Sequence, residues 1–218
     1  MPPPALREQL ELAMRLHPAP TRAEMQRREW RIWMAGVAAM VVTFLVFGGV
    51  TPGGRSASFL VASSLGWIVC AAFGMWAVFT RRRSGLGLPS HVLVGGALAT
   101  APLTWLGFVA VSEGFGNDHP FGTSWRGTVA CLIATLVLGT GPFVAGLLAK
   151  RRSDPVHPRA TGAAIGATAG AFAGVMIGLH CPAGAYAHVG MGHAAAALIL
   201  GVAGWVLGGP ALALRASR

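Results

Sequence analysis

Residues 160–182, ATGAAIGATAGAFAGVMIGLHCP, form a run of small and apolar side chains. Its uncharged part, Ala160–Leu179, has about 20 residues and would extend about 30 Å as a helix, the hydrocarbon thickness of a bilayer. Glycine recurs at every fourth position, and this spacing lets another helix approach one side closely. The partner helix can belong to the same chain or to a second copy, so a homo-oligomer is among our expectations. The glycines are Gly162, Gly166, Gly170, Gly174 and Gly178.

The rest of the chain has the same apolar character. Of its 218 residues, 54% are hydrophobic and only 11% are charged, against about 25% charged in an ordinary soluble domain. Too few charges are present to cover a soluble globule, and three cysteines are too few for a disulfide-rich secreted protein. We therefore predict an all-α, polytopic membrane bundle with six spans: Trp33–Val50, Phe59–Phe79, His91–Val111, Gly127–Ala149, Ala160–Leu179 and Ala187–Leu212.

The basic residues predict the orientation of this bundle. The net charge is +10, and all but two of the 17 Lys and Arg residues fall on one membrane face, the exceptions being Arg55 and Arg126. Excess basic charge marks the cytoplasmic side, so both termini are predicted to be cytoplasmic. The charge thus indicates orientation, and we expect no direct contact with nucleic acid. We expect a cytoplasmic segment 1–32, a transmembrane domain 33–212 and a cytoplasmic tail 213–218.

The N-terminal segment predicts two short helices separated by His17-Pro18-Ala19-Pro20. The second opens with Thr21-x-x-Glu24, a capping-box pattern, and continues into the first span. Trp30 and Trp33 are expected in the aromatic belt at the membrane interface. The first helix is amphipathic, and it can lie on lipid headgroups or dock into a groove of a partner protein. Its predicted binding surface includes Leu6, Leu10, Met14 and Arg15.

Cysteine and histidine residues gather near the predicted outer face. Cys70, in contrast, lies in mid-span and is expected to be a packing residue. Three interpretations of the outer residues stay open. They can be packing residues, Cys131 and Cys181 can form a redox couple if their Cα atoms lie within about 7 Å, or a metal can bind. The metal ligands would be His180, Cys181, His188 and His193. Against a metal, His188 and His193 would be separated by about 140° around an α-helix.

The six short spans, the short N-terminal segment, Cys131 and the pattern His180-Cys181-Pro182…His188…His193 resemble the NrsF-type family of bacterial inner-membrane anti-sigma factors. Within it, the resemblance is to myxobacterial negative regulators of light-induced carotenoid synthesis. It implies a binding protein without a cofactor, not an enzyme. Such a protein holds an extracytoplasmic-function sigma factor at the inner membrane and releases it on a stress signal, either light or oxidative stress.

The resemblance also implies roles for particular residues. The N-terminal segment would contact the sigma factor, although it lacks the HxxxCxxC motif of zinc-type anti-sigma domains. Release by redox change, by conformational change or by proteolysis remain alternatives. A membrane redox or metal-binding enzyme or transporter is the alternative function, although no Asp, Glu, Lys or Arg lies inside the spans to couple protons. The residues implied to sense the signal are Cys131, Cys181, His180, His188 and His193.

Overall fold

The computed structural model describes residues 21–51, 55–79, 88–115, 124–151, 153 and 155–213, and these contain helices but no strand. Six helical segments are long and apolar enough to cross a membrane, which confirms the predicted all-α class and the number of spans. The first five are α2 (Arg22–Val46), α3 (Ala57–Phe79), α4 (Ser90–Gly114), α5 (Trp125–Lys150) and α6 (Pro158–His180). The sixth joins α7 (Tyr186–His188), the π-helix η1 (Val189–Ala194) and α8 (Ala195–Leu212). Leu6, Leu10, Met14 and Arg15 lie outside the described residues.

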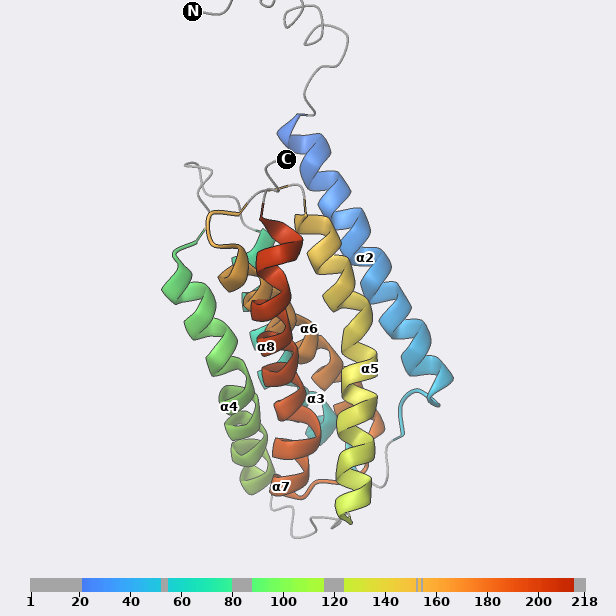
Figure 1. The fold of residues 1–218 in the computed structure, drawn as a ribbon. Coiled ribbons are helices and arrows are strands. Elements are labelled where there is room, and N and C mark those ends of the chain that lie inside the picture. The colour runs from blue at the N-terminus through green and yellow to red at the C-terminus, as the bar shows by residue number, and fades with distance from the viewer. Residues whose placement is uncertain are drawn as a thin grey trace, which may run out of the picture.

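Helix α6 occupies the middle of the bundle, where it contacts α3, α4, α5 and α8 (Figure 1). Its glycine stripe explains this position, because three of the glycines bring α6 against the backbone of α8. A methyl group added at Gly162, Gly166 or Gly170 would lie only 2.1, 1.9 or 2.3 Å from an α8 backbone atom. Gly174 meets the ring of Trp67 on α3, whereas Gly178 has no described atom within 4 Å. This part of the stripe therefore packs inside the chain.

Helix α2 lies on the outside of the bundle, along α5 (Figure 1). The two helices approach closely where a methyl group added at Gly36 would lie 2.7 Å from the carbonyl oxygen of Gly141. The same interface buries an ion pair between Glu29 and Lys150, with Oε2 and Nζ 2.9 Å apart and both side chains 6% exposed. The Lys150 ammonium also lies 4.7 Å from the centre of the Phe79 ring. Polar as well as apolar contacts thus stabilise the packing of α2 against α5.

The beginning of α2 follows the sequence prediction. The Thr21 hydroxyl accepts a hydrogen bond from Glu24 N (3.2 Å), and the Glu24 carboxylate accepts one from Thr21 N (2.7 Å), so the capping box is confirmed. The helix continues without a break from Arg22 into the apolar span, so no end of secondary structure marks residue 32.

Two details at this helix differ from the sequence prediction. The helix ends at Val46 and not at Val50, because Gly48 and Gly49 adopt φ angles of 102° and 63° that turn the chain away. Trp33 is only 1% exposed and packs against Phe79 with ring centroids 5.3 Å apart. Trp33 therefore does not face outwards as a belt residue would, because Phe79 of α3 packs against its ring.

The two ends of the bundle carry different polar groups. The start of α2 and the end of α8 lie at the same end as Lys150, which we call the Lys150 end (Figure 1). The start of α5 and the α7–η1 segment lie at the opposite end, which we call the Cys131 end (Figure 1). Between them, large apolar side chains face outwards, Val69 in the middle of α3 for example being 64% exposed. Such a surface suits lipid contact better than water.

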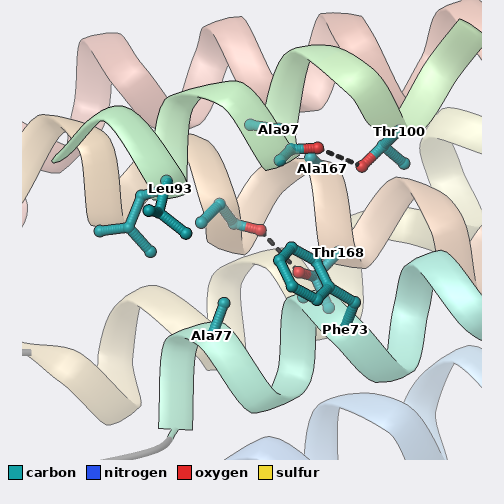
Figure 2. Close-up of a pocket in the computed structure, with 11 residues that line it drawn as sticks. Phe73, Ala77, Leu93, Ala97, Thr100, Ala167 and Thr168 are labelled. Carbon is teal, nitrogen blue, oxygen red and sulfur yellow. Dashed lines mark hydrogen bonds between the residues drawn. The ribbon is translucent and has the colours of Figure 1, made fainter. Parts of the chain in front are cut away.

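A small cavity between α3, α4 and α6 is a packing gap. Figure 2 shows that its wall carries two hydroxyl groups, each turned back to its own helix. Thr100 donates to Gly96 O (2.8 Å) and Thr168 donates to Ala164 O (2.6 Å). The volume is about 10 Å³, and the remaining labelled residues on the wall are Phe73, Ala77, Leu93, Ala97 and Ala167. Because both hydroxyls are engaged and the space is so small, this cavity is a poor ligand site.

Candidate functional site

Four thiol and imidazole side chains converge at the Cys131 end. Cys131 comes from α5, Cys181 from the connection after α6, His188 from α7 and His193 from η1. One potential ligand atom of each lies within 4.8 Å of the other three. The two Sγ atoms are 3.4 Å apart, and Cys181 Sγ lies 3.2 Å from His188 Nε2. We call these four residues the Cys/His cluster.

The π-helix explains how two histidines five positions apart can meet. In a regular α-helix they would point about 140° apart. A π-helix closes its hydrogen bonds between residues five apart, and it is often found at functional sites. Helix η1 covers Val189–Ala194, and the rings of His188 and His193 have centroids 5.1 Å apart at an angle of 79°. The α-helical geometry assumed in the sequence-based argument against a metal is therefore wrong here.

Two threonines of α5 hold the α7–η1 segment in place. The Thr135 hydroxyl lies 3.1 Å from Gly192 O and 2.7 Å from Cys131 O. Thr128 Oγ1 lies 3.1 Å from His188 Nδ1 and 3.5 Å from its own helix's Ser124 O. Because the Thr128 hydroxyl can donate to that carbonyl, it can accept from Nδ1–H of His188. This arrangement directs the lone pair of His188 Nε2 towards Cys181.

His193 has unused bonding capacity. It is buried at 2% exposure, and its Nε2 atom has no hydrogen-bond partner in the described part of the chain. A buried polar atom of this kind calls for a structural or functional explanation, because leaving it unsatisfied costs about 1–3 kcal/mol.

The sulfur of Cys181 has the more polar environment of the pair. The contact with Cys131 lowers the pKa of the Cys181 thiol, although burial opposes this shift. Arg55 lies at the same end and donates to Gly178 O (3.1 Å) and Thr51 O (3.3 Å). Burial lowers the pKa of its guanidinium, while the nearby Cys181 raises it. The surroundings of Cys181 therefore favour its thiolate form.

His180 has a different position from the other predicted sensing residues. Its Nδ1 atom lies 2.9 Å from Gly49 O, and its ring meets the edge of Phe44. Thr51 donates both a backbone and a hydroxyl hydrogen bond to the end of α6, the hydroxyl one to His180 O. His180 thus ties α6 to the connection after α2. The structure groups Cys131, and not His180, with Cys181, His188 and His193.

Several residues of structural importance were missed in the sequence analysis. Thr128 and Thr135 have no distinguishing motif, because their role depends on which helix lies beside α5. Arg55 was noted only as an exception to the charge distribution. One feature of the sequence pointed to the buried pair of Glu29 and Lys150: Lys150 is the only lysine among the 17 basic residues.

The Cys/His cluster can support two kinds of chemistry. Its two sulfur atoms are already in contact at 3.4 Å. A disulfide would require them to approach to about 2.05 Å. Alternatively, two sulfur and two nitrogen donors can surround a metal ion. These two uses compete for the same sulfur atoms.

Comparison with known families identifies the chain. A family model described as "NrsF: Negative regulator of sigma F" matches residues 12–213, which include all six helices and the whole Cys/His cluster. Comparison with curated proteins and with solved structures gives no match. Because the match covers nearly the entire sequence, the chain belongs to the NrsF family of negative regulators of sigma F.

Proposed function

We propose that this protein is a multi-pass inner-membrane anti-sigma factor that binds an extracytoplasmic-function sigma factor and releases it when the Cys/His cluster is oxidised. The observation that carries the proposal is a pair of thiols 3.4 Å apart in a chain that belongs to a family of negative sigma regulators. Membership in such a family indicates a binding protein and not an enzyme. Repression is then mass action, because a sigma factor held at the membrane is not free for RNA polymerase.

The surface and charge of the bundle support the membrane location. Its outward side chains are apolar, and six helices have the length and composition to span a bilayer. Described basic residues at the Lys150 end include Arg31, Arg151 and Arg159, whereas Arg55 and Arg126 lie at the Cys131 end. This asymmetry favours a cytoplasmic Lys150 end, and it supports a Cys/His cluster near the outer face, where disulfides persist.

The partner surface lies in the N-terminal segment. Leu6, Leu10, Met14 and Arg15 would form one face of an amphipathic helix that docks into the sigma factor. Deletion of residues 1–20 should leave a membrane-inserted protein that no longer represses a sigma-dependent reporter. Normal repression by the truncated protein would disprove this assignment.

The oxidation step can alter the bundle through α5. The thiols of Cys131 and Cys181 lose two protons and two electrons to form a disulfide, and an oxidant such as a peroxide takes them up to give water. The Sγ–Sγ distance then falls from 3.4 Å to about 2.05 Å, which draws the connection after α6 towards α5. Because α2 packs on α5 and leads back to the N-terminal segment, this shift can change the affinity for the sigma factor.

Cysteine variants test this step. Cys131→Ala and Cys181→Ala should each still repress the reporter but lose its induction by oxidant, because neither can form the disulfide. Cys70→Ala is the matched control and should be induced as in the unaltered protein, since Cys70 lies in α3 outside the cluster. Unchanged induction by oxidant in both cluster variants would contradict the redox step.

The proposed target of this regulation is a particular set of genes. The resemblance to CarR-type myxobacterial regulators supports light-induced carotenoid synthesis as the target. Deletion of the gene should then give carotenoid in the dark, measured by pigment absorbance. Dark cells without pigment would assign the protein to another set of genes and leave the anti-sigma test above unaffected.

A further inference from the structure

We propose that the Cys/His cluster is a zinc site, with Cys131, Cys181, His188 and His193 as its four ligands. This zinc would occupy the cluster in the resting protein, before any oxidation. Zinc bound at about 2.0–2.3 Å by four tetrahedral ligands places those ligand atoms about 3.3–3.8 Å apart. The Sγ–Sγ distance of 3.4 Å and the Sγ–Nε2 distance of 3.2 Å are close to this scale.

The unpartnered nitrogen of His193 gives independent support. Its imidazole is buried, and Nε2 has no hydrogen-bond partner in the described part of the chain. Leaving a buried polar atom in this state is costly, so a binding partner at Nε2 is expected. A metal ion among the cluster's ligand atoms can bind an imidazole nitrogen and explain the burial.

The support around His188 also fits a metal ligand. Imidazoles that bind metals usually donate a hydrogen bond from their other nitrogen, which fixes the tautomer and the ring orientation. Thr128 Oγ1 lies 3.1 Å from Nδ1 of His188, while Nε2 faces Cys181. Thr128 is therefore suited to orient His188 for coordination.

The charge of the donor set suits a site embedded in an apolar bundle. Two thiolates neutralise one divalent cation, and two neutral imidazoles add no charge. The occupied site therefore has no net charge to desolvate, and this matters because an unpaired buried charge is costly. Arg55, a further titratable group nearby, has its guanidinium hydrogen-bonded to backbone carbonyls.

The coordination number separates this site from an enzyme centre. Four protein ligands with sulfur and nitrogen donors are typical of structural zinc, whereas catalytic zinc keeps one position for water or substrate. The cavity beside the cluster, lined by Arg55, Cys181 and His193 among others, has a volume of about 10 Å³. Space for about one water molecule is too little for a substrate.

Zinc would also govern the proposed switch, and this consequence rests on the proposed function. Both sulfurs are thiolate ligands while zinc is bound. On oxidation, the two thiolates give two electrons to the oxidant and join as a disulfide, and zinc leaves as Zn²⁺. A peroxide oxidant takes up these two electrons with two protons and becomes water. Oxidation and zinc release should therefore occur together.

The test is the zinc content of the full chain, purified in mild detergent under reducing conditions and equilibrated with Zn²⁺. We expect about one zinc per chain, and a visible absorption typical of tetrahedral cobalt after replacement by Co²⁺. Cys181→Ser and His193→Asn should lose the metal. Cys70→Ser and His180→Gln are matched controls and should keep it, because neither residue belongs to the cluster.

A second measurement does not depend on the folding of variants. In the unaltered protein, bound zinc should slow the alkylation of Cys131 and Cys181, and a chelator should remove this protection, whereas the alkylation of Cys70 should not depend on zinc. Zinc-independent alkylation of all three thiols, substoichiometric zinc in the unaltered chain, or equal zinc in cluster and control variants would each overturn the proposal. Metal content is measured without a sigma factor, so a failure of this test is distinguishable from a failure of the anti-sigma function.

Discussion

The two ends of the bundle bury polar side chains in contrasting ways. At the Lys150 end, the ammonium of Lys150 and the carboxylate of Glu29 meet at 2.9 Å, and the Phe79 ring covers the ammonium. At the Cys131 end, thiols and imidazoles meet, and His193 Nε2 lacks a partner in the described part of the chain. The first group is satisfied by the protein itself, whereas the second has bonding capacity left for a metal or a reaction.

The Glu29–Lys150 pair, which we call the joint, holds two helices together, whereas the Cys/His cluster is a reactive site. Helix α5 contains both, because Cys131 lies near its start and Lys150 is its last residue. A change at Cys131 can therefore reach α2 through a single continuous helix, provided that the joint at Glu29 holds. Substitutions at each end test this division.

Breaking the ion pair should have the largest effect. Lys150→Met removes the ammonium that pairs with the buried Glu29 carboxylate, which should lower the free energy of unfolding by about 3–5 kcal/mol. The double variant Glu29→Gln/Lys150→Met should recover most of this loss, because no charge stays buried. Thermal unfolding in detergent measures both changes. Equal stability of the single and double variants would contradict the role of this pair as a joint.

The same variants also address the Cys131 end. Zinc binding should survive in the double variant, because the cluster contains neither residue. Loss of zinc there would show that the cluster depends on the charged pair at the Lys150 end.

The spans could be predicted from sequence because membrane crossing depends on local properties. A run of about 20 apolar residues is sufficient for a helix of the required length, whichever helices surround it. The capping box at Thr21 and Glu24 is equally local, since both partners lie within one turn. The end of α2 was less predictable, because Val50 is apolar but follows two glycines in left-handed conformation.

The site was only partly predictable because it depends on contacts between helices. The cysteines and histidines could be assigned to one face, yet His180 could not be separated from His188 and His193 by composition. The π-helix decides which histidines meet, and its hydrogen-bond pattern has no clear signal in Val189–Ala194. Burial of Glu29 likewise depends on Lys150, 121 positions later in the chain.

Alanine substitutions of glycines in α6 should have an intermediate effect on stability, and this effect should differ between the two ends. An added methyl group at Gly166 would lie 1.9 Å from Leu200 O, whereas one at Gly178, near the Cys131 end, would meet no described atom within 4 Å. Gly166→Ala should therefore destabilise the protein by about 1–3 kcal/mol, because the α8 backbone must move. Gly178→Ala should be close to neutral in the same unfolding experiment. A loss of similar size in both would show that the Cys131 end is packed as tightly as the remainder of α6.

The smallest expected effect comes from one hydroxyl group beside the reactive site. Thr128→Val keeps the shape of the side chain but removes the acceptor for His188 Nδ1–H, so the imidazole is held less firmly. Zinc affinity, measured by competition with a chelator, should fall about 10–100-fold. Thr140→Val on the same helix is the control and should leave affinity unchanged, because the exposed Thr140 hydroxyl bonds to Leu136 O in its own helix (2.9 Å). Equal affinity in the two variants would mean that His188 needs no fixed orientation, and the contrast between the Glu29–Lys150 pair and the Cys/His cluster would then rest on His193 and the two cysteines alone.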